Sequence, residues 1–150
     1  MIYALVLIIA LMPVTAIAQV FERLDESETP VGLNAREPAL TALPHGGIAM
    51  VWTEADGKNF AIKTAIFGEE SWTEPLTVVS SNALFVNWAD FPAIAAFDDG
   101  TLIISWLKEN AALSYAYDIN LALSDDGRQN WGDAITPHMA KGSNLAIHDA

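Results

Sequence analysis

The fold of this chain is decided by a stretch that occurs twice, as Pro38-Ala-Leu-Thr-Ala-Leu-Pro-His-Gly-Gly-Ile-Ala-Met-Val-Trp52 and as Pro92-Ala-Ile-Ala-Ala-Phe-Asp-Asp-Gly-Thr-Leu-Ile-Ile-Ser-Trp106. In both copies a short apolar run is followed by a glycine-containing turn and by a second apolar run that ends in tryptophan. The two copies are 54 residues apart. Each copy is typical of two strands joined by a tight turn, so the sequence predicts an internal structural repeat.

Two further strands follow in each copy. The predicted strands are Ala39–Leu43, Ile48–Thr53, Phe60–Phe67 and Ser71–Val79 in the first copy, and Ala93–Phe97, Thr101–Leu107, Asp118–Leu123 and Trp131–Thr136 in the second. The second strand of each copy is nearly continuously apolar, which is typical of a strand buried on both faces. Four antiparallel strands per repeat predict an all-β fold built from propeller blades, and the alternative is a compact β-sandwich.

Composition excludes several classes of protein. The 150 residues include 19 Asp and Glu against 7 Lys and Arg, a formal charge of −12 that repels nucleic acid. Because the chain has no cysteine, disulfides, thiolate zinc sites and cysteine nucleophiles are excluded. The three histidines are too scattered to indicate a metal site, and we expect neither a metal nor a cofactor; they are His45, His138 and His148.

The amino-terminal residues predict export. Met1–Ala18 has no charged side chain, and Ala16-Ile-Ala18 is the small-x-small pattern of a signal peptidase site, so cleavage is expected before Gln19. A membrane anchor is the alternative, but the apolar run is short for a span and Pro13 interrupts it. We therefore expect a secreted or periplasmic protein with no stable membrane insertion after cleavage. The expected segments are a signal peptide (1–18), an acidic lead-in (19–36), two blades within 37–138 (about 37–80 and 91–137) and an atypical tail (139–150).

One turn in the second copy carries a motif. The stretch Ser124-Asp-Asp-Gly-Arg-Gln-Asn-Trp131 resembles the Asp-box, Ser-x-Asp-x-Gly-x-Thr-Trp, of the bacterial sialidase-like propellers. Ser124, Asp126 and Trp131 match the motif, and we expect Gly127 to supply the positive φ of the turn. Short Ser and Asp side chains can bond the turn amides while the tryptophan fills the space between sheets.

The resemblance extends from about Arg36 to His138, because Phe85-Val-Asn-Trp-Ala-Asp-Phe-Pro92 and Tyr115-Ala-Tyr-Asp118 look like segments of secreted sialidase-like proteins. It implies a six-bladed propeller, of which about two blades are present. Beyond His138 the sequence departs from that family, and we expect the end of the chain to be truncated or frame-shifted.

The resemblance also implies a site. In that family three arginines hold the carboxylate of the substrate, an Asp is the acid/base and a Tyr–Glu pair is the nucleophile. Arg36-Glu-Pro38 is similar to the Arg-Ile-Pro motif of the first arginine. Strand order places the Asp-box turn at one end of a blade and the remaining candidates at the other. These candidates are Asp118 and Asp90 as acid/base, and Arg36, Trp88, Tyr115 and Tyr117 as substrate-binding residues.

The catalytic set implied by the family is incomplete in this chain, because Arg23 and Arg128 lie in the lead-in and in the Asp-box turn. The sequence therefore predicts a sialidase-like protein, related to glycoside hydrolases, that is inactive as given. The alternative is a non-catalytic propeller that binds a glycan or a protein. A sialylated or other glycan is the expected partner, nucleic acid is not, and open blade edges are expected to pair or aggregate.

Overall fold

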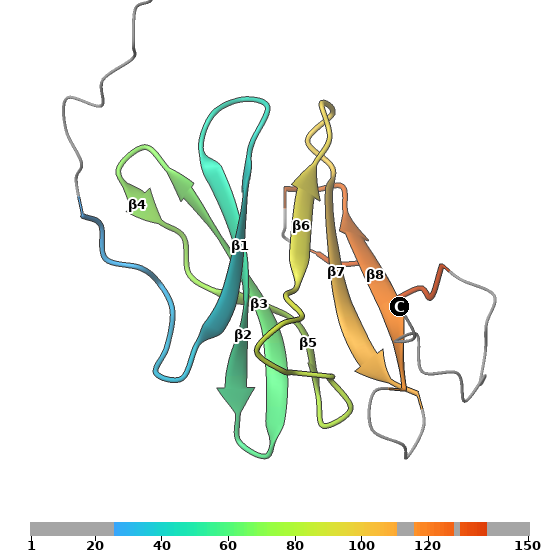
Figure 1. Cartoon of the computed structure of the whole chain (residues 1–150). Coiled ribbons are helices and arrows are strands. Elements are labelled where there is room, and N and C mark those ends of the chain that lie inside the picture. Colours follow the sequence, from blue (N-terminus) through green and yellow to red (C-terminus); the bar gives the residue numbers. More distant parts are fainter. Residues whose placement is uncertain (1–25, 111–115, 128–129, 138–150) are drawn as a thin grey trace, which may run out of the picture.

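The computed structural model describes residues 26–110, 116–127 and 130–137. This part of the chain is all-β, as the sequence predicts, and forms two antiparallel sheets without any helix among the described residues (Figure 1). The five-stranded sheet contains β1 (Arg36–Ala42), β2 (Ile48–Asp56), β3 (Asn59–Gly68), β4 (Ser71–Trp72) and β5 (Leu76–Ser81). The three-stranded sheet contains β6 (Ala93–Ala96), β7 (Leu102–Glu109) and β8 (Tyr117–Ser124).

In the first sheet the order is β1-β2-β3-β4, and β5 also pairs with β3. The sequence predicted one strand over Ser71–Val79, and the structure divides it into β4 and β5. Pro75 lies between the two strands and has no N–H with which to continue a ladder. Both short strands still use the same edge of β3, because β4 pairs with Phe67 and Gly68 and β5 pairs with the earlier half of β3.

In the second sheet the order is β6-β7-β8. The predicted fourth strand, Trp131–Thr136, is reduced to one bridge between Ile135 and Leu121 in the described residues. The segment still follows β8 towards Trp131, because the Gly132 backbone N–H donates a 2.8 Å hydrogen bond to the Leu123 carbonyl oxygen. Gly132 and Asp133 are poor strand formers, which explains why this pairing is irregular. The link between the sheets adds a second bridge, from Leu84 to Lys108 of β7.

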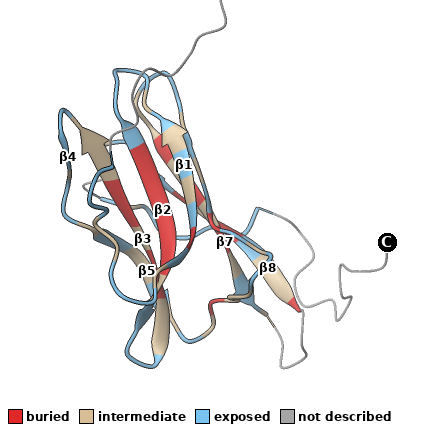
Figure 2. Cartoon of the chain, turned by 60° about the vertical axis from the view of Figure 1, so that its left-hand side comes forward, coloured by how far each residue is buried: buried red, intermediate tan, exposed pale blue. Residues whose placement is uncertain are grey.

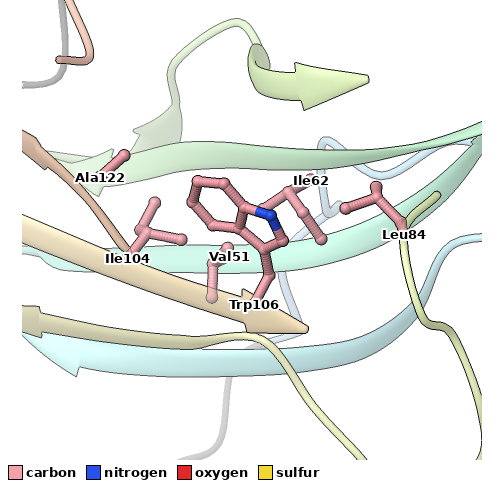
Figure 3. Close-up of a cluster of buried hydrophobic side chains, with 6 residues drawn as sticks. All are labelled: Val51, Ile62, Leu84, Ile104, Trp106 and Ala122. Atoms are coloured by element: carbon pink, nitrogen blue, oxygen red, sulfur yellow. The ribbon is translucent and has the colours of Figure 1, made fainter. Parts of the chain in front are cut away.

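The two sheets pack face to face. Val51 of β2 and Ile62 of β3 meet Ile104 and Trp106 of β7, together with Leu84 and Ala122, in one buried cluster (Figure 3). Every member of this cluster is at most 5% exposed. β1 and β6 lie side by side, so the first strands of the two repeats are neighbours across the contact between the sheets (Figure 1).

A second cluster covers the other face of the five-stranded sheet. Met50, Trp52 and Ala65 are buried there under Val31 and Ala35 of the lead-in, with Trp72 beside them. β2 is consequently buried along most of its length (Figure 2). The lead-in is thus a cover for this face of the sheet.

The two Trp-ended strands differ in burial. The prediction that both faces are buried is confirmed for β2, in which five consecutive residues, Ala49–Thr53, are buried. It is wrong for β7, where burial alternates and Leu102, Ile104 and Trp106 are buried. The reason is that the five-stranded sheet covers only one face of β7, and nothing in the described chain covers the other.

The connections divide between two ends of the molecule (Figure 1). The β1–β2, β3–β4 and β6–β7 turns lie at one end, and the β2–β3 turn and the β5–β6 link lie at the other. The first end includes Gly47, whose φ is +92° and where a Cβ would stand 2.6 Å from the carbonyl oxygen of Phe67. Only glycine fits that turn. We call the opposite end, with the β5–β6 link, the link end.

Candidate functional site

Arg36 begins β1 at the link end. It is exposed, and its guanidinium carbon lies 5.5 Å from the centroid of the Phe60 ring. The pairing of β1 with β2 shifts register between Arg36 and Ala39, which marks a bulge. The bulge and the aromatic platform hold this cation at the surface of the sheet end.

Glu37 occupies the bulge and is the residue that the sequence analysis missed. It is 8% exposed and has a φ of +58°, a strained conformation for a non-glycine residue before proline. Burial raises the pKa of Glu37; a hydrogen bond with the Thr53 side chain and the charge of Arg36 oppose the rise, and the charge of Asp90 adds to it. The sequence did contain a signal for Glu37, because this carboxyl group stands where the Arg-Ile-Pro motif has an apolar residue.

The link between the sheets presents Trp88. The side-chain oxygen of Asn87 accepts hydrogen bonds from the backbone N–H of Ala89, at 2.6 Å, and of Asp90, at 2.8 Å. The Asn87 amide also donates to the Asp90 carboxylate. This tight Asx turn leaves Trp88 89% exposed at its tip. A large aromatic ring is therefore held in solvent on a well-bonded turn.

Asp90 connects the link to both sheets electrostatically. Burial is the largest cause of the raised pKa of Glu37 in β1, and the charge of Asp90 adds to it. Burial is also the larger cause of the raised pKa of Tyr117 in β8, and the charge of Asp90 is the second. The Tyr117 ring lies against Phe85 with centroids 4.7 Å apart. The structure thus brings two of the candidates, Arg36 and Asp90, close to Glu37, and Tyr117 is coupled to this pair through the charge of Asp90.

Asp118 makes a local contact at the beginning of β8. Consecutive residues of a strand point to opposite faces, so Asp118 and Tyr117 diverge from β8. The Asp118 carboxylate accepts a hydrogen bond of 2.8 Å from the side chain of Asn110 and thereby ties the beginning of β8 to the end of β7. Its geometry is that of a local bonding residue. Tyr115 lies outside the described residues.

The Asp-box-like turn lies at the end of β8. The Asp126 carboxylate accepts hydrogen bonds from the Ser124 hydroxyl (2.9 Å), the Asn130 backbone N–H (2.9 Å) and the Asn130 side chain (2.6 Å). Gly127 has a φ of +70°. Trp131 is only partly buried and packs against the cluster between the sheets. These contacts make Asp126 the organising acceptor of the turn.

Replacing Asp126 by alanine is expected to lower the free energy of unfolding by about 1–2 kcal/mol, because three donors lose a charged acceptor near the surface. Urea unfolding followed by circular dichroism measures this change. The neighbouring exposed Asp125 is the matched control, and its replacement by alanine is expected to change stability by less than about 0.5 kcal/mol. Equal effects at the two positions would contradict the organising role of Asp126.

The cavities of the described part restrict what the link end can do. A cavity of about 10 Å³ lies between Glu37, Asp90 and Trp106 and holds no more than about one water molecule. This cavity is too small for a sugar, so a ligand at the link end would lie on the exposed surface, where Arg36 and Trp88 are found. A much larger hollow, about 820 Å³, lies near the opposite end between the lead-in and β4, but its rim carries five glutamates. These are Glu26, Glu28, Glu69, Glu70 and Glu74.

The described residues contain no group of three or more His, Asp or Glu side chains arranged to hold a metal ion. They also contain no helix long and apolar enough to cross a membrane. The chain matches no protein-family model and no curated protein.

Proposed function

We propose that this chain is a secreted, sialidase-like protein of the propeller type that binds an anionic glycan at its link end. The observation that carries the proposal is that an exposed cation and an exposed aromatic ring lie at the same end of the molecule. Arg36 suits a sugar carboxylate, and Trp88 suits the apolar face of a sugar ring. A sialylated oligosaccharide offers both features.

Two observations support blades over a closed sandwich. The first strands of the two repeats, β1 and β6, lie side by side, as the innermost strands of neighbouring blades do. Repeat-equivalent residues also lie on equivalent faces of the two sheets. Val51 faces the second sheet, and its equivalent Ser105 lies on the open face, where a following sheet would pack. Trp52 faces the lead-in that precedes the first sheet, and its equivalent Trp106 faces the first sheet, which precedes the second.

Binding is favoured over hydrolysis. Among the described residues Arg36 is the one arginine, so the carboxylate would be held by a single guanidinium. Each missing electrostatic partner typically costs a factor of about 10²–10³ in rate. The arrangement supports recognition without turnover.

The purified full chain is expected to bind 3′-sialyllactose more tightly than lactose in isothermal titration calorimetry. Replacing Trp88 by alanine should weaken sialyllactose binding about tenfold or more, since the packing of the apolar face of the sugar ring against the indole is lost. Replacing Arg36 by alanine should abolish the preference for the sialylated sugar. Phe97→Ala is the matched control, because Phe97 is 51% exposed at the opposite end and its loss should change nothing.

Hydrolysis of a fluorogenic sialoside by the same protein is expected to stay at the level of a buffer blank, and Asp118→Asn should leave that result unchanged. Turnover abolished by Asp118→Asn would overturn the non-catalytic part of the proposal. Equal affinity for lactose and 3′-sialyllactose, or no binding of either sugar, would overturn the glycan-binding part.

A further inference from the structure

The three-stranded sheet has an apolar face that nothing in the described chain covers. This face points away from the five-stranded sheet, and two of its large aliphatic side chains, Ile119 and Leu123, are 45% and 42% exposed. A shallow hollow of about 190 Å³ crosses its centre. The strand residues on this face are mostly apolar, and the one charged member, Glu109, lies at the link end of β7; the others are Ala93, Ala95, Ile103, Ser105, Leu107, Tyr117, Ile119, Leu121 and Leu123.

The internal repeat identifies this open face with a face that is already an interface. At the 54-residue spacing Ala39 corresponds to Ala93 and Val51 corresponds to Ser105. Ala39 and Val51 belong to the cluster between the two sheets. The face of the first sheet that packs against the second sheet therefore corresponds to the open face of the second sheet, which is uncovered.

The sequence of β7 agrees with this interpretation. Leu102–Leu107 is nearly continuously apolar, the pattern of a strand buried on both faces, but the structure buries one face alone. A contiguous exposed apolar surface on a sheet is characteristic of an interaction site. The open face thus has the composition of an interface.

A second copy cannot cover the open face in the way that the second sheet covers the first. That contact would require the outer face of the five-stranded sheet, where Trp52 is 0% exposed beneath Val31 and Ala35. The lead-in is fastened there by a 3.0 Å hydrogen bond from the Gly32 backbone N–H to the Glu54 carboxylate. Of the two outer sheet faces in the described part of the chain, the one that stays uncovered on a second copy is its own open face.

We propose that two copies of this chain associate symmetrically through their open faces, β6-β7-β8 against β6-β7-β8. Such a contact is self-complementary and closes at two copies. Each chain carries a formal charge of −12, so the two copies repel one another at long range, while the open face is uncharged except for Glu109 at its link-end edge. Added salt screens the repulsion and therefore favours the dimer. The inference does not depend on glycan binding.

Sedimentation velocity of the full chain over a range of concentrations tests the proposal. We expect a monomer–dimer equilibrium that shifts towards the dimer when sodium chloride is added. Leu123→Glu is expected to weaken association at least tenfold, whereas Leu40→Glu, at a 61% exposed position on β1, should not change it. Circular dichroism of both variants shows whether the sheets remain folded.

The absence of cysteine allows a second test that does not depend on a disruptive charge. Ser105→Cys places one thiol on the central strand of the open face, and a short bismaleimide should join two such chains. Leu40→Cys should stay uncrosslinked under the same conditions. A wild-type chain that is monomeric at every concentration would overturn the proposal, as would growth beyond two copies or a dimer that survives Leu123→Glu in folded protein.

Discussion

Replacing Trp106 by alanine is expected to lower the free energy of unfolding by about 3–5 kcal/mol. Trp106 is 5% exposed, and its indole lies among Val51, Ile62 and Ile104 at the contact between the sheets (Figure 3). The substitution removes a large apolar surface and leaves a cavity that strands on both sides cannot readily close. It therefore acts on the buried cluster that joins the two sheets.

Trp88→Ala is the matched control for this experiment. It removes the same side chain from a position that is 89% exposed, and stability should change by less than about 0.5 kcal/mol. Urea unfolding followed by far-ultraviolet circular dichroism avoids the loss of tryptophan fluorescence in both variants. If the two substitutions had equal effects, the face-to-face packing of the sheets would be contradicted.

The strand pattern could be predicted because it is local. The repeat places Trp52 and Trp106 at equivalent ends of the second strands, and the glycine turns before them fix hairpins whose side-chain alternation follows directly. What the pattern could not supply was the number of layers. β2 and β7 are equally apolar, yet only β2 is covered on both faces, because the lead-in residues Val31 and Ala35 cover the first sheet.

The candidate site was predictable in part for the same reason. Strand order alone sends Arg36, Asp90 and Tyr117 to one end, and in the structure all three lie at the link end, with Tyr117 on the face of β8 that points away from the five-stranded sheet. Glu37 was missed because its burial depends on a bulge in β1, and a bulge is a register property of two paired strands. Asp118 was separated from Tyr117 by the alternation of β8, which the sequence does show once the strand boundary is known.

Replacing Glu54 is expected to lower the free energy of unfolding substantially, because its carboxylate binds the lead-in to the first sheet. It accepts hydrogen bonds from the Trp52 indole N–H (2.9 Å), the Gly32 backbone N–H (3.0 Å) and the Lys63 ammonium (2.6 Å). A Cβ on Gly32 would stand 2.8 Å from the carboxylate, so the lead-in approaches as closely as it can. Few positions in the described chain join so many separate segments.

Glu54→Ala is expected to cost about 2–4 kcal/mol, because the fully buried Trp52 loses the acceptor of its N–H and Lys63 loses its ion-pair partner. Limited proteolysis should also cleave the lead-in near Gly32 faster than in the wild type, because its anchor is gone. Glu70→Ala, at an exposed position in the β3–β4 turn, is the control for both measurements.

The pH dependence of stability provides an independent test of the Glu54 contacts. Burial alone would raise the pKa of Glu54, but the hydrogen bonds from Lys63, Trp52 and Gly32 and the charge of Lys63 outweigh burial and lower it below 4.5. Since the folded state then binds this proton less readily than the unfolded chain, the stabilisation is complete above pH 4.5 and is lost as the pH falls through the folded-state pKa. The wild type should therefore lose stability more steeply below about pH 4.5 than Glu54→Gln, which has no proton to bind there. Parallel curves for the two proteins would mean that the carboxylate does not fasten the lead-in as a charged acceptor.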